Sequence, residues 1–349
     1  MRGKRIAALL LSGMMAASVL TGCGLDTNAV VATLDGEEIT LGVPNFTARL
    51  QQAQYDDFYV AYFGEEVWSS DLYGNGTTME SNTKDEILQM VWDMYLFLSH
   101  MDDYGVSITD EEAAAITEAA TAFINDNEKD ALDALGATQE IVEEYLTLVT
   151  VQYKMHEAII ADADTNVSDA DANTSAYSYV RVSKTTYTDA EGNTAEYTED
   201  EQAVLAVNVK EFAAAAKEST LETEAEASGY TVSQGTFASD DTTLDEAVLT
   251  ALQGLKEGET SDVVETDGYY YVLRLDAVTD EEATEEHRQE IISERQSALY
   301  DEVLTGWEEA SEWVVDEKVW DKVTFDNLFT TVAPSTETET VDETTESVQ

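Results

Sequence analysis

The sequence predicts an α+β protein in which a helical part, built from an N-terminal and a C-terminal segment, is interrupted by a compact domain of strands and helices. Apolar residues recur at spacings of three and four along 84–160 and again along 285–313, which is the period of an amphipathic helix. After a polar linker at 161–175 the pattern changes to strand, helix, helix and strand within about 100 residues. We therefore expect the C-terminal helix to return to the N-terminal helices, with the α+β domain as an insertion.

The first 22 residues have the organisation of an export signal. Three basic residues among the first five precede a mostly apolar run over 6–20, which is too short to span a membrane comfortably. The sequence LTGC at 20–23 resembles a bacterial lipobox, in which small residues let a peptidase cut before a cysteine that then carries lipid. Cys23 is the only cysteine of the chain. We expect an exported protein whose lipidated Cys23 holds it at the outer face of the cell membrane; a plain signal peptide or an anchor helix is the alternative.

The chain is strongly acidic. It has 73 Asp and Glu against 17 Lys and Arg, a formal net charge of −56, and loss of the three basic residues of the signal leaves −59. This charge repels nucleic acid and anionic lipid surfaces, so neither is expected as a direct partner. A hydrophobic content of 43% still provides for a core. The final residues, 331–349, have no apolar period and are predicted to be a disordered acidic tail.

The segment 23–160 is predicted to begin with two strands and to continue as helices. Residues 28–41 read as two strands around an Asp-Gly turn. Gly105 is placed to end a helix, and Thr109 with Glu112 has the spacing of a capping box that begins the next one. The apolar residues of the expected helices lie in stripes that are typical of core packing. The expected helices cover 84–104, 109–125 and 139–160.

The linker at 161–175 partly matches the pattern of a calcium-binding loop, but the complete pattern is absent. It contains two runs of the form Asp-x-Asp-x-Asn. A calcium loop of this kind also needs glycine at its sixth position and glutamate at its twelfth. Neither run offers either residue. We expect no metal site and no cofactor.

Residues 176–277 are predicted to form the inserted α+β domain, and 278–330 the returning helical segment. The last strand of the domain carries three consecutive tyrosines, 269–271. Strand alternation places Tyr271 with the leucines at 273 and 275 on one face, and Tyr270 on the other. The expected elements are strands over 176–184 and 262–275, helices over 200–217 and 244–255, and a short glycine-containing segment over 233–237.

This order of segments resembles the parvulin-type foldases of the PrsA and SurA kind, which are exported peptidyl-prolyl isomerases and chaperones. The resemblance is carried by VVATLDGEEIT (30–40), by GVSITDEE (105–112) and by LQGLKEGETSDVVETDGYYYVLRL (252–275), together with the lipobox and the returning helix. It implies a helical chaperone part formed by 23–160 and 278–330, and a parvulin-like domain at 176–277.

The resemblance also implies where a catalytic pair would lie. Parvulins usually have one histidine in the first strand and another in the last strand of the domain. These positions fall on Tyr179 and on Tyr271, and a one-residue shift would move the second to Tyr270. The three histidines of this chain all lie outside the predicted domain, which leaves the role of the tyrosines open. They are His100, His156 and His287, which we interpret as surface or core residues.

Four further positions complete the implied site. The acidic or cysteine position after the first helix of the domain corresponds most closely to Glu222. Phe237, after the glycine of SQGTF, corresponds to the characteristic aromatic residue of the family, and Leu244 supplies part of an apolar prolyl pocket. Tyr270 is counted with them as a substrate-binding candidate.

Two interpretations of the tyrosines follow from the chemistry. Prolyl isomerisation passes through a twisted amide, and its uncatalysed barrier is roughly 20 kcal/mol. Tyr179 and Tyr271 can donate hydrogen bonds to such an amide, or they can simply pack the strands of a domain without catalytic activity. No other catalytic set is present, because a domain without histidine or cysteine excludes histidine-based triads.

The sequence therefore predicts an extracytoplasmic, membrane-anchored foldase that binds unfolded exported polypeptides and has weak or no isomerase activity. The alternative is a cell-envelope binding or assembly lipoprotein that uses the parvulin fold only as a scaffold. A solute-binding lipoprotein ranks third, because it would need two larger α/β lobes and only one short α+β region is present.

Overall fold

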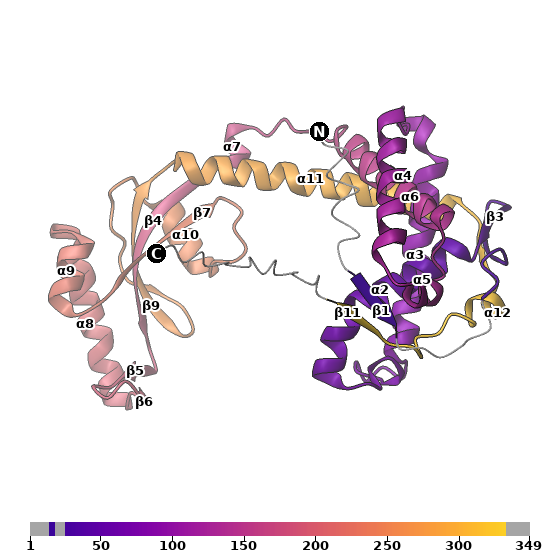
Figure 1. Ribbon diagram of the computed structural model, residues 1–349. Coiled ribbons are helices and arrows are strands. Elements are labelled where there is room, and N and C mark those ends of the chain that lie inside the picture. Colours follow the sequence, from indigo (N-terminus) through magenta and orange to yellow (C-terminus); the bar gives the residue numbers. More distant parts are fainter. Residues whose placement is uncertain (1–13, 18–24, 333–349) are drawn as a thin grey trace, which may run out of the picture. The chain divides into compact units, whose positions relative to one another are not determined.

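The computed structural model describes residues 14–17 and 25–332 (Figure 1). The chain divides into two compact units, the first formed by 1–162 with 299–349 and the second by 163–298. The predicted fold class is confirmed, because a mainly helical unit is built from both ends of the chain and a mixed unit is inserted between them. Among the described helices, none has the length and apolar character needed to cross a membrane. The predicted lipidation site, Cys23, lies outside the described residues, as do residues 333–349 of the tail predicted over 331–349; residues 331 and 332 belong to a strand instead.

Small antiparallel sheets join the two ends of the chain in the first unit. β2 and β3 form the hairpin predicted around an Asp-Gly turn, where Asp35 has φ 51° and Gly36 has φ 87°. β10 pairs with the free side of β2, and β1 pairs with β11. Each sheet therefore contains strands from both sequence ends, although β1 lies within the predicted export signal and is absent from a mature chain that starts at Cys23. The strands are β1 (Met14–Ala17), β2 (Val30–Leu34), β3 (Glu37–Thr40), β10 (Trp313–Val315) and β11 (Phe329–Val332).

The helices of the first unit begin and end largely where local signals place them. The capping box of Thr109 and Glu112 forms in both directions at the start of α4. Gly105 adopts a left-handed conformation, but it ends a 3-10 turn that follows the predicted helix. The helices α2 and α5 were not expected from the sequence. The helical elements are α2 (Gly42–Phe63), η1 (Val67–Ser69), α3 (Met79–Ser99), η2 (Met101–Tyr104), α4 (Asp110–Asp126), α5 (Lys129–Leu135), α6 (Gln139–Ile160), α12 (Glu317–Trp320) and the C-terminal part of α11 (Glu281–Ala310).

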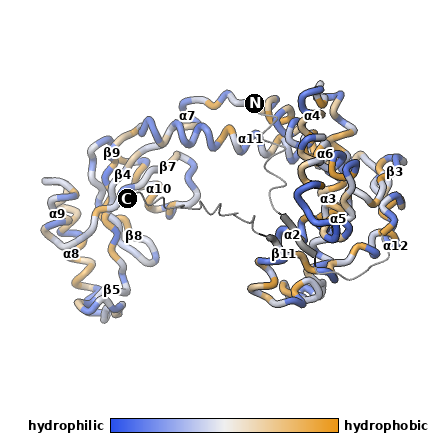
Figure 2. The backbone as a smooth tube through the Cα atoms, in the orientation of Figure 1, coloured by the Kyte–Doolittle hydropathy of each residue, from blue (hydrophilic) through white to orange (hydrophobic). Residues whose placement is uncertain are grey.

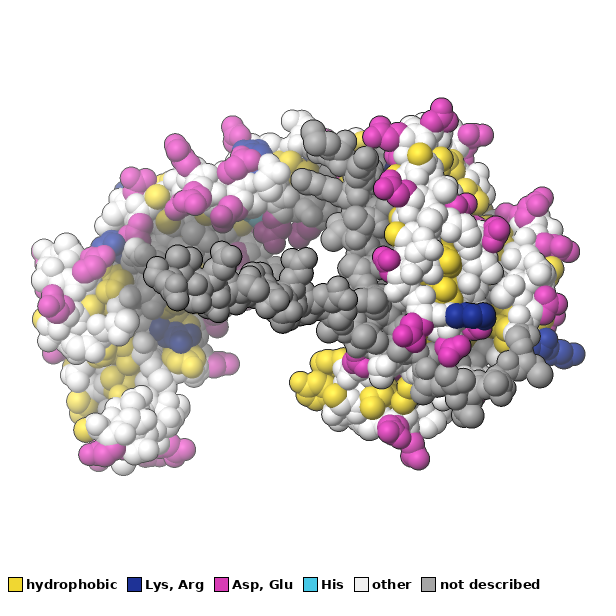
Figure 3. Space-filling view, in the orientation of Figure 1, with side chains coloured by type: hydrophobic (Ala, Val, Ile, Leu, Met, Phe, Trp, Pro, Cys, Tyr) yellow, Lys and Arg dark blue, Asp and Glu magenta, His cyan; other side chains and the backbone are white. Residues whose placement is uncertain are grey.

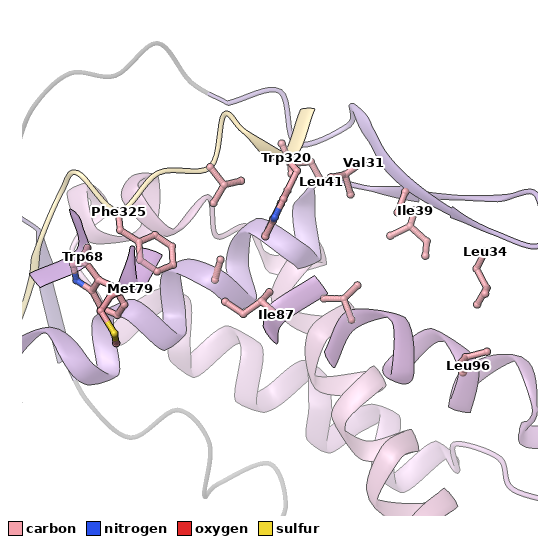
Figure 4. Close-up of a cluster of buried hydrophobic side chains, with 14 of the residues drawn as sticks. Val31, Leu34, Ile39, Leu41, Trp68, Met79, Ile87, Leu96, Trp320 and Phe325 are labelled. Carbon is pink, nitrogen blue, oxygen red and sulfur yellow. The ribbon is translucent and has the colours of Figure 1, made fainter. Parts of the chain in front are cut away.

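The main core of the first unit also combines both ends of the chain (Figure 4). Val31 of β2, Ile87 of α3 and Trp320 of α12 are almost completely buried in it. Phe325 meets the Trp68 ring edge-on at 4.8 Å between ring centroids. The apolar faces of the N-terminal helices are thus covered by a segment about 230 residues later in the chain.

A buried polar network fixes the C-terminal segment to α2. Arg49 is only 4% exposed and donates to the carbonyl oxygen of Asn327 at 3.0 Å. The Asp56 carboxylate accepts hydrogen bonds from the Trp68 indole at 2.6 Å and from the Phe329 backbone N–H at 2.7 Å. Burial lowers the pKa of Arg49 to about 10 and raises the pKa of Asp56. Because both charged groups are buried away from water, their hydrogen-bond partners in the protein replace the solvation that they would have at the surface.

The second unit has a four-stranded antiparallel sheet in the order β7-β4-β9-β8, with helices on both faces. α8 and α9 cover one face, where Val180 and Val272 meet Leu205 and Phe212. α10 covers the other. In Figure 2 the tube of α8 changes between blue and orange along its length, as expected for a helix with one buried side. The elements are α7 (Asp169–Ala172), β4 (Thr174–Ser183), β5 (Thr186–Thr188), β6 (Thr194–Glu196), α8 (Glu199–Glu218), α9 (Leu221–Ser228), β7 (Val232–Ala238), α10 (Glu246–Gly254), β8 (Val264–Glu265), β9 (Tyr269–Ala277) and the N-terminal part of α11.

The polar segment at 161–175 lies along α11. It contains α7, and β4 begins within it at Thr174. Arg288 donates to the carbonyl oxygen of Val167 at 2.6 Å, and Arg295 donates to that of Asp164 at 3.1 Å. Two of the few basic residues of the chain therefore hold this acidic segment in place.

Candidate functional site

The sheet face covered by α10 collects the aromatic side chains of the second unit. β4 contributes Tyr177 and Tyr179, and β9 contributes Tyr271. Tyr179 pairs directly with Leu273 across the two strands, so both point to this face. The ring centroids of Tyr179 and Tyr271 are 6.1 Å apart, and those of Tyr177 and Tyr179 are 5.5 Å apart. The structure thus brings together the two tyrosines predicted at the family's histidine positions and adds a third. We call Tyr177, Tyr179 and Tyr271 the tyrosine cluster.

Tyr177 was missed by the sequence analysis, although it lies two residues from Tyr179 on an alternating strand. It is 6% exposed, whereas Tyr179 and Tyr271 are half-buried. Burial, together with the nearby phenols and the Asp241 carboxylate, raises the pKa of Tyr177 to about 12. Tyr177 therefore stays protonated at neutral pH and keeps its capacity to donate a hydrogen bond.

Asp241 places a negative charge beside the tyrosine cluster. Burial raises the pKa of this carboxyl group, but hydrogen bonds from Thr243 and Leu244 outweigh burial, and the net pKa is lowered. The Thr243 hydroxyl and the Thr243 backbone N–H both donate to one Asp241 oxygen at 2.7 Å. The carboxylate is thus held ionised in the loop between β7 and α10. Nothing in the sequence pattern distinguished it from the many other acidic residues.

Gly235 allows the Tyr177 ring to lie across β7. The two residues are directly paired in the sheet. A Cβ atom on Gly235 would lie 2.9 Å from three atoms of the Tyr177 ring, closer than such contacts occur. The glycine of SQGTF is therefore required by packing, because the Tyr177 ring could not occupy its position beside a larger residue.

An apolar wall borders the tyrosine cluster. Phe237 is 6% exposed and meets the Tyr177 ring at 5.8 Å between centroids. Leu244 packs into the same cluster of side chains, as do Val248 and Leu252 of α10. Both residues predicted for the prolyl pocket are thus on the same side of the sheet as the tyrosines.

Tyr270 lies on the opposite face of the sheet. It packs with the α8 and α9 side, and the Lys184 ammonium lies 5.4 Å from the centre of its ring. Because successive strand residues point to opposite faces, only one of Tyr270 and Tyr271 can share a face with Tyr179. The structure places Tyr271 there.

Glu222 is also on the opposite face, in α9. Its carboxylate accepts a hydrogen bond from Arg274 at 2.6 Å, and this lowers its pKa. Arg274 also donates to Asp276 at 2.5 Å, and the buried hydroxyl of Ser178 donates to the same carboxylate at 2.5 Å. Glu222 thus belongs to an ion-pair network that borders an open depression of roughly 630 Å³ on this face. The structure does not bring it to the tyrosine cluster.

None of the histidines belongs to the tyrosine cluster, although the charge of His287 acts on Asp241 beside it. His100 stacks on Trp307 with a centroid distance of 4.2 Å and pairs with Asp103 at 2.7 Å. A His287 ring nitrogen lies 3.1 Å from the carbonyl oxygen of Ala172. Over residues 14–17 and 25–332, no group of three or more His, Cys, Asp or Glu side chains is placed to hold a metal ion.

Part of the inserted unit matches a known protein family. Residues 179–287 match the PPIC-type PPIase domain family, from β4 to the first turns of α11. This part of the chain is therefore similar to peptidyl-prolyl isomerase domains of the PPIC type, as the resemblance of the sequence implied. Tyr179, Phe237 and Tyr271 lie inside the matched segment.

Solved structures similar to the whole chain include foldases of the PrsA type. The PrsA foldase of Lactococcus lactis is 17% identical, with 85% of this chain and 99% of that chain covered and a TM-score of 0.35. PrsA of Bacillus cereus is 16% identical, with 85% and 98% covered and a TM-score of 0.31. A SurA-like chaperone structure from Campylobacter jejuni is 13% identical, with 82% and 99% covered and a TM-score of 0.30. No curated protein is similar to this chain. Because all three TM-scores are below 0.5, the similarity used below is that of residues 179–287 alone.

Proposed function

We propose that this protein is an extracytoplasmic foldase whose inserted domain binds proline-containing segments of unfolded polypeptides on the tyrosine cluster. The single observation that carries the proposal is the position of the cluster. Three phenol groups, with Phe237 and Leu244 beside them, share one face of a PPIC-type domain. An apolar wall beside fixed hydrogen-bond donors suits a proline ring and the carbonyl group that precedes it.

The same arrangement supports a weak isomerase. In the twisted transition state the amide carbonyl loses conjugation, and a placed hydrogen-bond donor stabilises the changed charge distribution. Tyr179 and Tyr271 are half-buried, so part of each side chain is accessible to a bound chain. The apolar wall removes water from the proline ring, which also favours the less polar, twisted amide.

The experiment that tests this proposal is a protease-coupled prolyl isomerisation assay on the mature chain. We expect Tyr179→Phe and Tyr271→Phe each to lower kcat/KM by about three- to tenfold, the usual effect of one lost hydrogen bond. Tyr187→Phe, on β5, is a matched control because its ring is exposed and belongs to a separate hairpin. Equal activity of all variants would refute a role for the phenols in catalysis.

Membrane attachment through Cys23 is part of the proposal. It is supported by the LTGC sequence at 20–23 and by the absence of any other cysteine. We expect cells supplied with labelled palmitate to label the wild-type protein and not a Cys23→Ser variant. Labelling of that variant would refute this mode of attachment.

The second candidate is a cell-envelope binding or assembly lipoprotein without catalysis. It is favoured by one observation, the presence of tyrosine at both positions where the family usually has histidine. Two results together would support it: no isomerisation above buffer, and recovery of one defined envelope partner rather than unfolded chains in general.

A further inference from the structure

The last turns of α2 carry aromatic side chains that the fold leaves exposed. They recur at spacings of three and four, the pattern that normally marks the buried side of a helix. Tyr62 is 72% exposed and Phe58 is 54% exposed. Figure 3 shows hydrophobic side chains gathered at the lower end of this unit, with acidic side chains beside them. We call the four exposed residues Tyr55, Phe58, Tyr62 and Phe63, with the partly buried Tyr59 between them, the aromatic stripe.

Contacts between its rings and with the main core hold the aromatic stripe in place. The Phe58 and Tyr62 rings are 4.6 Å apart, and those of Tyr55 and Tyr59 are stacked at 5.4 Å. Tyr59 meets the buried ring of Trp68 at 5.6 Å, which joins the stripe to the main core of the unit. The rings therefore form a supported platform, and a bound chain would not have to order them first.

The surroundings of the stripe are acidic. Residues 50–83 contain no lysine or arginine and six acidic residues, of which Asp56 is buried and does not contribute to the surface. Glu65, Glu66 and Asp71 are exposed next to it in the sequence. Asp71 accepts hydrogen bonds from the backbone N–H groups of Asn75 and Gly76 at 3.1 and 2.9 Å, which orders the loop that follows. The stripe thus presents apolar rings within a negative field.

The negative charge around the aromatic stripe determines which kinds of partner it attracts. A second copy of the chain has a net charge of −56 and is repelled. The residues from 335 onward have five acidic and no basic side chains, so the chain's own tail is repelled as well. Anionic lipid is disfavoured for the same reason. A basic polypeptide segment is attracted, and its lysine or arginine side chains can also lie over the exposed rings.

We infer that the aromatic stripe binds short unfolded segments that combine aromatic or aliphatic side chains with lysine or arginine. From Tyr55 to Phe63 the helix rises about 12 Å, which matches three or four residues of extended chain. The inference rests on the proposed foldase function and adds a preferred substrate class at a site outside the PPIC-type domain. Binding to so short a platform is weak for one segment and suits repeated capture and release.

Fluorescence anisotropy on the full mature chain tests the inference. The probe is a fluorescein-labelled nonapeptide with three phenylalanines, three lysines and three serines; it has no proline, so that prolyl recognition is not measured. We expect Phe58→Gln with Tyr62→Gln to weaken binding at least fivefold. Glutamine retains helix propensity, and both side chains are exposed, so the fold should be preserved. Val204→Gln with Val207→Gln on α8 is the matched control, because these side chains are 58% and 54% exposed.

Two further probes separate the contributions of charge and apolar contact. A peptide with glutamate in place of lysine should bind at least tenfold more weakly, and the lysine peptide should lose affinity as salt increases. Equal binding of the two peptides, or equal loss in the Val204 and Val207 control, would overturn the inference. The proposed function fails separately, because it is tested by proline-containing peptides and isomerisation, which the α2 variants should leave unchanged.

Discussion

At the scale of single residues, the contact between Gly235 and Tyr177 determines the shape of the tyrosine cluster. The sequence showed a glycine before an aromatic residue but not what the glycine faces. In the structure it faces a nearly buried phenol ring, and no side chain would fit between them. Tyr177 is also the member of the tyrosine cluster whose pKa is raised. The contact with Gly235 therefore affects both the packing of the cluster and its capacity to donate hydrogen bonds.

Replacing Gly235 by alanine should displace the Tyr177 ring. We expect the free energy of unfolding of the second unit to fall by about 1–3 kcal/mol, the usual effect of overpacking. Gly254→Ala in α10 is the control, since an added Cβ there meets nothing within 4 Å. Urea unfolding followed by tyrosine near-ultraviolet signal measures both. Equal stability of the two variants would contradict this account of Gly235.

At the scale of elements, two helices from opposite ends of the chain meet at a pair of carboxyl groups. Gln89 of α3 donates to Asp93 at 2.9 Å and to Glu308 of α11 at 2.5 Å. Burial and the Glu308 carboxylate together raise the pKa of Asp93 to about 7, against a smaller lowering by the hydrogen bond from Gln89. The folded protein therefore binds a proton at Asp93 between about pH 4 and pH 7 that the unfolded chain has released.

This proton linkage predicts how stability depends on pH. Because the folded pKa is above the unfolded one, the contribution of Asp93 falls as pH rises through this window. We expect Asp93→Asn to stabilise the first unit at pH 8 by about 1 kcal/mol, a value reduced because the group is partly solvated, and to have no effect near pH 4. Thermal unfolding at both pH values measures this, with the exposed Asp85→Asn of the same helix as control. A gain that is equal at both pH values would exclude the linkage.

At the scale of the whole molecule, the first unit depends on residues from both sequence ends. Trp320 and Phe325 lie in its core, and β10 completes the sheet that β2 begins. All five tryptophans of the chain belong to this unit, so tryptophan emission reports on it alone. They are Trp68, Trp92, Trp307, Trp313 and Trp320.

A chain that ends at Ala298 should therefore lose the first unit and keep the second. We expect the emission of Trp68 and Trp92 to shift to the wavelength of an unfolded chain, because their core is left uncovered. The far-ultraviolet signal of the sheet in 163–298 should remain. Blue-shifted emission from the truncated chain would show that the N-terminal segment folds without the C-terminal one.

The sequence by itself determined most element types and the insertion of one domain in another, and its family resemblance implied Tyr179, Tyr271, Phe237 and Leu244 as site residues. The element types follow from local periods and caps, which act over a few residues, whereas α2 and α5 were not expected. Only the tertiary structure decided that Glu222 pairs with Arg274 on the opposite face, because the face an α-helix covers depends on how the chain crosses the sheet. The tertiary structure also decided that the aromatic stripe of α2 stays exposed, since the periodicity of a helix does not specify whether another segment will cover its apolar side.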